Sequence, residues 1–270
     1  MKTLIISITI LLFGVFLVCA QSTASKQVST FVIEAPQIKT HKMIWVYLPK
    51  SYSISKKNYP VIYMFDAQNL FDDETSYIGE WKIDEYLDTL KTKEAIIIGI
   101  EHGNEKRFEE LTPYKNEKYS SGKGDDFLNF IMHTLKPHVD TIYRTKADAS
   151  HTSVIGASLG GLMAFYATLK YPEVFGSSGV FSASFWINPE IYDAIQSNTT
   201  LSNDDSKFFF LIGSEEGDEM VHGQEQIIQL LKEKGINEER IKNKVVPGGT
   251  HNETLWSTNF PEVFNWLIPN

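Results

Sequence analysis

A serine flanked by glycines is the first feature of the chain that indicates chemistry. It lies in Gly156-Ala157-Ser158-Leu159-Gly160-Gly161, between an apolar run at Thr152–Ile155 and an apolar helical segment at Leu159–Lys170. A Gly-x-Ser-x-Gly pattern between a strand and a helix is typical of a tight turn that exposes a nucleophilic hydroxyl. The alternative is a structural turn in which Ser158 only caps the helix.

A serine hydroxyl needs a general base, and two histidines follow Ser158 in the chain. His251 comes directly after a predicted strand, Lys242–Val246, in a loop that contains two glycines. His222 lies at the start of a predicted helix. Because the chain order in hydrolases with this turn is serine, acid, histidine, we predict that His251 is the base. We interpret His222 as a surface residue.

The acid that orients the histidine should lie in the turn after the predicted strand Lys207–Ile212. That turn offers several carboxylates, most of which we expect to be a solvated acidic surface. Glu216 stands three residues after Gly213, the usual glycine-to-acid spacing at this place. Glu216 is therefore the first candidate, followed by Asp218 and then Glu215.

Two backbone N–H groups are needed to bind the oxyanion that forms during acyl transfer. One should belong to Leu159, directly after the nucleophile, and the other to the loop after the third strand. Here that loop follows Val61–Phe65 and begins with Asp66, so Ala67 or Gln68 is the expected second donor.

The rest of the chain alternates short apolar runs with amphipathic helical segments. This order predicts a mainly parallel central sheet with helices on both faces, an α/β-hydrolase fold in a single domain. The longest irregular stretch is 103–123, and it is a candidate for lining a functional site. The remaining predicted strands are Phe31–Ile33, Met43–Leu48, Ala95–Ile100 and Gly179–Ser182; the remaining predicted helices are Glu80–Leu90, Asp125–Tyr143 with an interruption at Pro137, Gln224–Lys234 and Phe260–Leu267.

The N-terminus has the pattern of an export signal. Lys2 precedes an apolar run, Leu4–Val18, and Val18-Cys19-Ala20 resembles a signal-peptidase site. We expect residues 1–20 to be a cleaved signal peptide, 21–29 a short polar segment and 30–270 the folded domain. The expected location is periplasmic or extracellular, without stable membrane insertion after cleavage. An uncleaved anchor and a lipoprotein acylated at Cys19 are the less favoured alternatives.

Composition excludes several classes of protein. The formal net charge is -9 and no basic run is present, which argues against a nucleic-acid partner. The chain has one cysteine, so an intramolecular disulfide and a cysteine-based metal site are excluded. An acidic stretch around Asp72, Asp73 and Glu74 lacks the glycine and the regular spacing of a calcium loop. We therefore expect neither a metal site nor a cofactor.

These residues together resemble the Putative esterase family of α/β hydrolases, which includes enterochelin-type siderophore esterases and feruloyl esterases. The resemblance extends from about Phe31 to Leu267. It rests on the stretches Val46–Pro49, Tyr59–Asp66, Gly99-Ile100, Arg107 with Glu110–Pro113, Tyr143–Thr145, Gly156–Gly161, Phe175-Gly176 and Ser182–Trp186. It implies a serine hydrolase without a cofactor. It also suggests Arg107 and Trp186 as substrate-binding residues.

Each of these two residues also has a structural interpretation. Arg107 could bind a substrate carboxylate, but pairing with Glu109 or Glu110 is slightly favoured. Trp186, together with Trp81 and Trp256, could form an aromatic wall, although part of the core is the preferred interpretation. His102, at the end of a predicted strand, is interpreted as an exposed loop residue.

The resulting hypothesis is an exported serine esterase with a Ser158–Glu216–His251 triad. Its expected partner is a small-molecule or polysaccharide-linked ester, with siderophore esters and plant-polysaccharide esters as the candidate classes. An acyltransferase with the same residues is one alternative, and a non-catalytic binding protein that keeps the fold is another. The sequence leaves the oligomeric state open.

Overall fold

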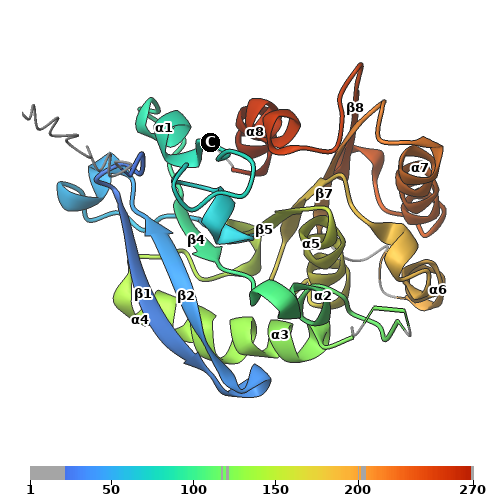
Figure 1. The fold of residues 1–270 in the computed structure, drawn as a ribbon, viewed down its shortest axis with the longest axis horizontal. Helices are drawn as coiled ribbons and strands as arrows, with labels where there is room; N and C mark the ends of the chain where they lie inside the picture. The colour runs from blue at the N-terminus through green and yellow to red at the C-terminus, as the bar shows by residue number, and fades with distance from the viewer. Residues whose placement is uncertain (1–21, 117, 120–121, 200, 202–204, 269–270) are drawn as a thin grey trace, which may run out of the picture.

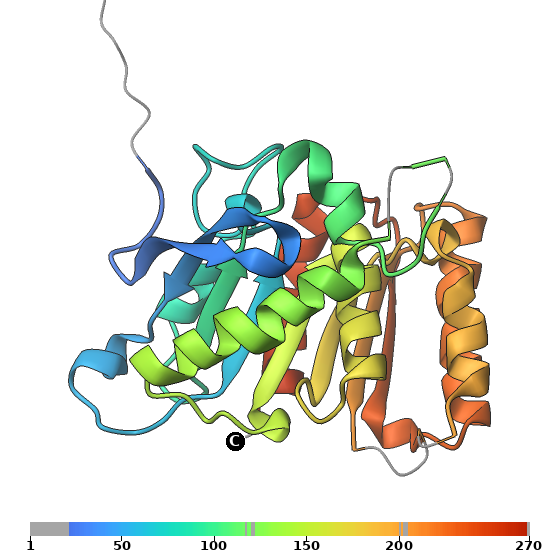
Figure 2. The same cartoon turned by 90° about the horizontal axis from the view of Figure 1, so that it is seen from below.

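The computed structural model contains an eight-stranded sheet. Helices pack on both faces of this sheet (Figures 1 and 2). The structure describes residues 22–268 apart from 117, 120–121, 200 and 202–204, so the expected signal peptide lies outside the described residues. The strands are β1 (Val28–Ala35), β2 (Thr40–Tyr47), β3 (Val61–Phe65), β4 (Ile96–Ile100), β5 (Thr152–Ala157), β6 (Ser177–Phe181), β7 (Lys207–Gly213) and β8 (Ile241–Val246).

The strand order is β1-β2-β4-β3-β5-β6-β7-β8. The β1–β2 and β2–β4 pairs are antiparallel, and the other pairs are parallel. This arrangement confirms the predicted α/β-hydrolase fold class. The central strands are buried on both faces, which explains their continuous apolar runs.

Different sets of helices cover the two faces of the sheet (Figure 2). The apolar residues of α1 (Ile83–Asp88) and α8 (Glu253–Leu267) pack in one cluster on one face. Those of α3 (Gly124–Phe130), α5 (Leu159–Lys170), α6 (Glu190–Ser197) and α7 (Asp218–Glu233) pack in a second cluster on the other face. Along β3 the side chains alternate: Tyr63 and Phe65 belong to the second cluster, and Met64 to the first.

Strand register brings the predicted site residues to one edge of the sheet. Met64 of β3 pairs with Ile155 of β5, so the segments that follow these parallel strands emerge side by side. Phe181 of β6 pairs with Ala157 of β5, and Gly213 of β7 pairs with Val246 of β8. The loops after five neighbouring strands therefore meet at the carboxyl edge, where ligands bind in open α/β sheets.

Several predicted helix boundaries are wrong. The helix expected from Gln224 begins at Asp218, and the helix expected from Phe260 begins at Glu253. The helix expected over Glu80–Leu90 is limited to α1. Pro137 does not interrupt its helix: a π-helical stretch at Ile131–Leu135 joins α3 to α4 (Lys136–Ile142), and Pro137 lies in the first turn of α4, where a missing N–H costs little.

The structure also contains elements that the sequence did not predict. Helix α6 lies between β6 and β7, and the four-residue helix α2 (Arg107–Glu110) lies within the long irregular stretch.

At the sheet edge, Lys242 and Lys244 of β8 both form ion pairs with Glu262 of α8. Within the described residues, no helix is both long and apolar enough to span a membrane.

A buried ion pair fixes α2 to the sheet. Lys42 Nζ of β2 lies 2.6 Å from Glu110 Oε2 of α2, and the two side chains are 3% and 4% exposed. Lys42 also donates to the Glu101 carbonyl, and Glu110 accepts from the Gly103 N–H. Burial lowers the pKa of Lys42, opposed by the nearby charge of Glu110.

Removing one member of this pair should be costly, because the other charge stays buried without a partner. We expect Lys42→Met to lower the free energy of unfolding by about 3–5 kcal/mol in urea denaturation. Lys123→Met removes a more exposed ion pair with Glu109, whose side chains are 55% and 27% exposed, and should lower the free energy of unfolding far less. Equal losses in the two variants would contradict a structural role for the Lys42–Glu110 pair.

Candidate active site

Ser158 occupies a strained turn between β5 and α5. Its backbone angles are φ 60° and ψ −120°, a region that residues other than glycine rarely adopt. The turn is also crowded: a Cβ on Gly156 would lie 2.4 Å from the backbone of Gly160, and one on Gly161 would lie 2.6 Å from the Phe181 carbonyl oxygen. Glycine is therefore required by space at positions 156 and 161, and the turn projects the serine at the carboxyl edge of the sheet.

Glu216 and His251 meet across two loops. His251 Nδ1 lies 2.7 Å from Glu216 Oε2, and the Glu216 side chain is 0% exposed. The other oxygen of Glu216 accepts hydrogen bonds from Ser182 Oγ at 2.7 Å and from the Gly213 N–H at 2.8 Å. This carboxylate is thus fixed on both oxygens and presents one of them to the imidazole.

The other two candidate carboxylates lie elsewhere. Asp218 is the first residue of α7, and Asp218 and Glu215 are both exposed. The contact of Glu216 with His251 depends on a close crossing of loops, because a Cβ on Gly213 would lie 2.2 Å from the Gly249 carbonyl oxygen. A side chain at Gly213 would separate the acid from the histidine.

Two residues that the sequence analysis did not connect with Glu216 or His251 support this pair. Trp256 Nε1 donates to Ser182 Oγ at 2.8 Å, and Ser182 Oγ donates in turn to Glu216. The Trp256 ring also packs edge-to-face on His251, with 5.1 Å between ring centroids. Ser182 follows β6 with a positive φ of 46°, a conformation that could not be read from its sequence neighbours.

Ser158 and His251 line the same cavity. Among the described residues, the recorded hydrogen-bond partner of the Ser158 hydroxyl is Ser184 Oγ, at 3.2 Å, and the Ser184 N–H donates to the Ser158 carbonyl. In structures without substrate, the hydrogen bond between nucleophile and base is often long and tightens on binding. Ser184 is therefore a neighbour of Ser158, and among the described residues Ser158 makes no hydrogen bond to His251.

The residues expected to supply the oxyanion N–H groups stand at the starts of two helical turns. Leu159 is the first residue of α5, and Ala67 and Gln68 open a short 3-10 turn, Ala67–Asn69. The leading N–H groups of a helical turn have no partner within the turn. Asp66, which precedes this turn, has a left-handed backbone with φ 58° and redirects the chain after β3.

Arg107 does not pair with Glu109 or Glu110, so that expectation is wrong. Its Nε and Nη2 atoms donate to the two carboxylate oxygens of Asp66, each at 2.8 Å. Glu109 pairs with Lys123, and Glu110 is held by Lys42.

This bidentate pair borders both the cavity and the predicted oxyanion loop. Asp66 Oδ2 lies 3.3 Å from the position that a Cβ on Gly160 would take, so the carboxylate covers the start of α5. Burial would lower the pKa of Arg107, but the charge and hydrogen bonds of Asp66 raise it overall. Arg107 therefore stays charged and holds the loop that starts at Asp66.

The cavity beside Ser158 has a volume of about 260 Å³ and partly aromatic walls. Tyr77, Trp81 and Trp256 line it, the two tryptophans from largely buried positions. His102 also lines it, so its interpretation as an exposed loop residue is wrong; burial lowers the pKa of its imidazole. Trp186 is not among the lining residues: it is 46% exposed and packs edge-to-face on Tyr119.

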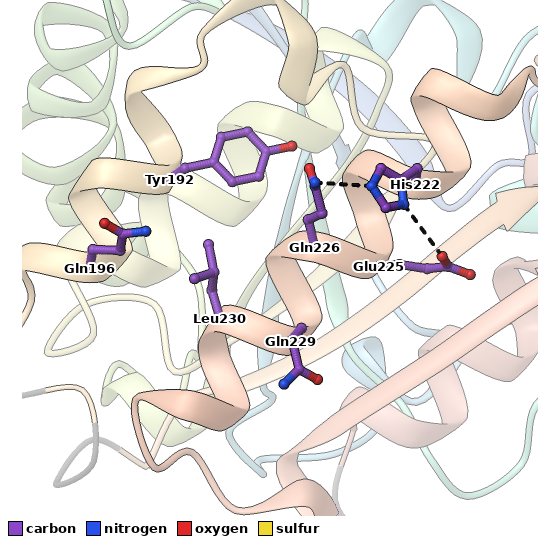
Figure 3. Close-up of a pocket in the computed structure, with 7 residues that line it drawn as sticks. All are labelled: Tyr192, Gln196, His222, Glu225, Gln226, Gln229 and Leu230. Carbon is purple, nitrogen blue, oxygen red and sulfur yellow. Dashed lines mark hydrogen bonds and ion pairs between the residues drawn. The ribbon is translucent and has the colours of Figure 1, made fainter.

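A second cavity of about 660 Å³ lies between α6 and α7 (Figure 3). Its walls are Tyr192, Leu230 and several glutamines, and its histidine, His222, contacts Gln226 and Glu225 on the same helix. The His222 side chain is exposed, as expected for a surface residue. No serine or cysteine lines this cavity, and of these two cavities Ser158 and His251 line the smaller one.

Comparisons with known proteins identify the family. The family model described as "Putative esterase" matches residues 35–267, which confirms the resemblance stated above. The uncharacterized protein YbbA of Bacillus subtilis (strain 168) is 30% identical over 235 residues, 82% of this chain and 90% of YbbA. An endo-1,4-beta-xylanase/feruloyl esterase of Xylanibacter ruminicola is 28% identical over 158 residues, which are 55% of this chain and 20% of that longer protein.

A similar solved structure supports the fold. The siderophore hydrolase EstB from Aspergillus nidulans matches with a TM-score of 0.72 and 17% identity, covering 91% of this chain and 96% of EstB. At this level of identity the match shows the fold alone. The chain belongs to the Putative esterase family, and this membership supports the hydrolysis of carboxylic esters.

Proposed function

We propose that this protein is an exported serine esterase that hydrolyses carboxylic esters through an acyl-enzyme on Ser158. The observation that carries the proposal is the 2.7 Å contact between Glu216 and His251 beside the cavity that also exposes Ser158. Export is supported by the apolar N-terminal run at Leu4–Val18.

The proposed reaction has two halves. Ser158 Oγ attacks the ester carbonyl carbon, and Nε2 of His251 takes the hydroxyl proton, while Glu216 holds Nδ1 and stabilises the imidazolium. The resulting oxyanion accepts hydrogen bonds from the N–H of Leu159 and from an N–H of the Ala67–Gln68 turn. Collapse breaks the bond to the alcohol, which receives the proton from His251. Water then attacks the acyl-enzyme with the same base and releases the acid.

The substrate class follows from the walls of the cavity. Tyr77, Trp81 and Trp256 offer aromatic surface within reach of Ser158, which favours an ester with a planar aromatic group next to the scissile bond. Feruloyl esters of plant polysaccharides and aromatic siderophore esters both have such a group. Because Arg107 is engaged by Asp66, a free substrate carboxylate would have to compete with that ion pair.

Loss of the nucleophile should abolish turnover. We expect Ser158→Ala to lower kcat by about 10⁴–10⁶-fold on aryl acetates, feruloyl esters and iron–catecholate trilactones. A fluorophosphonate probe should label the parent and Ser184→Ala but not Ser158→Ala. Release of free acid with and without an added alcohol acceptor distinguishes hydrolysis from acyl transfer. Parent-level turnover by Ser158→Ala would overturn the proposal.

The acid can be identified by three matched substitutions. We expect Glu216→Gln to lower kcat by about 10²–10⁴-fold, because the imidazole loses the charge that orients it. Glu215→Gln and Asp218→Asn make the same change of charge at exposed positions and should change kcat less than about twofold. A large loss in Asp218→Asn with a small one in Glu216→Gln would assign the role to Asp218.

Arg107 should act as a positioning residue through Asp66. We expect Arg107→Met and Asp66→Asn each to lower kcat by about 10–100-fold with a smaller change in KM, since the N–H groups that bind the oxyanion shift. Arg107→Lys should recover part of the loss. A direct role in binding a carboxylate predicts the opposite, a rise in KM restricted to anionic esters. Steady-state kinetics with one neutral and one anionic aryl ester separates these outcomes.

A further inference from the structure

Three carboxylates converge near Trp81, one of the residues that line the cavity beside Ser158. Glu80 directly precedes Trp81, while Asp84 and Glu85 lie in the first turn of α1. One carboxylate oxygen from each residue lies within 4.8 Å of the others. Glu80 is 6% exposed and Asp84 0% exposed, whereas Glu85 is open to solvent. The cluster therefore has a buried wall and an open side.

Two oxygens of this cluster are buried without a hydrogen-bond partner. Glu80 Oε1 accepts from Thr23 Oγ1 at 3.0 Å, and Asp84 Oδ2 accepts from the Ser25 N–H at 2.6 Å. The second oxygens, Glu80 Oε2 and Asp84 Oδ1, have no partner among the described residues. Buried carboxyl oxygens are normally hydrogen-bonded, protonated or bound to a metal ion, so these two atoms require an explanation.

No basic side chain among the described residues forms an ion pair with the cluster, although the charge of Lys82 slightly favours the ionised form of Glu80. In the part of the chain that the structure describes, none of the ion pairs involves Glu80, Asp84 or Glu85. Lys82 lies between Glu80 and Asp84 in the chain, but its side chain is exposed. Like charges at this separation repel one another strongly once they are removed from water.

We propose that Glu80, Asp84 and Glu85 bind one calcium ion. Oxygen ligands alone, with no imidazole or thiolate, suit a hard divalent cation. Calcium accepts six to eight oxygens in flexible geometry, which the carboxylates and waters entering from the Glu85 side can supply. Magnesium demands near-ideal octahedral geometry and gives up its waters reluctantly, which fits a partly dry wall of carboxylates less well.

The ligands come from a short segment that contains no EF-hand pattern, which is why the sequence analysis expected no metal. The sequence directed attention to Asp72, Asp73 and Glu74, but Asp72 is occupied by Ser22 and Thr23. The turn before α1 instead brings Glu80 over Asp84. Bound calcium would fasten three parts of the molecule together: α1, the Thr23–Ser25 segment and the residues around Trp81, a wall of the cavity.

Terbium and thermal unfolding test the site on the intact protein. Tb³⁺ replaces Ca²⁺ in oxygen sites, and Trp81 next to Glu80 should sensitise its luminescence; added Ca²⁺ should quench that signal by competition. After EDTA treatment, Ca²⁺ at about 100 times its Kd should raise the Tm by about 5–10 °C. Equal concentrations of Mg²⁺ should have a clearly smaller effect.

Matched variants make the test specific. Glu80→Gln and Asp84→Asn should lose both the Tb³⁺ signal and the calcium-dependent rise in Tm. Glu74→Gln makes the same change of charge at an exposed neighbouring position and should keep both responses. In EDTA, Asp84→Asn should be at least as stable as the parent, since it relieves repulsion. This measurement separates a lost site from a misfolded variant.

Three results would overturn the proposal. The first is a parent protein whose Tm does not respond to Ca²⁺. The second is a response of equal size in Asp84→Asn, which would indicate binding elsewhere. The third is a response to Mg²⁺ that equals or exceeds the response to Ca²⁺, which would exclude calcium as the preferred ion.

Discussion

The hydrogen bond between Glu216 and His251 is the constraint on which the candidate site depends. A carboxylate that is removed from water must have its oxygens satisfied, and here the Gly213 N–H and Ser182 Oγ satisfy one of them. Only the other oxygen remains for the imidazole. The carboxyl ends of β6, β7 and β8, together with Trp256 of α8, must all be in register for this single contact to form.

Two ion pairs hold the opposite side of the site, and both involve helix α2. This four-residue helix has Glu110 at its end, which is anchored to β2 by Lys42. Arg107, at its start, reaches Asp66 and the turn that follows β3. A short helix would be marginal on its own. Two charged contacts compensate for its length and hold the predicted oxyanion loop against the start of α5.

Sequence patterns predicted those features of the structure that depend on residues close together in the chain. The order of strands and helices identified the fold class, and glycine spacing selected Ser158, because a tight turn leaves a signature within five residues. The choice of Glu216 among three carboxylates also rested on local spacing, and its contact with His251 needed the structure. The partner of Arg107 could not be predicted, since Asp66 is 41 residues away and the two residues are brought together by the pairing of β3 with β4, which places Phe65 beside Ile100. The predicted first residues of α7 and α8 were wrong for a related reason. Gly223 and Pro261 look like helix boundaries in the sequence, yet both lie inside helices that tertiary packing stabilises.

Strand β8 has two separate roles in the structure. It ends at Val246, five residues before His251, and it is also an open edge of the sheet. An open edge invites a strand from another molecule, and lysines at such positions oppose that pairing. Lys242 and Lys244, which both pair with Glu262, place positive charge on this edge strand and so disfavour the addition of a strand beside the histidine loop. The same short strand thus leads into the loop of the proposed base and carries the charges that guard the open edge of the sheet.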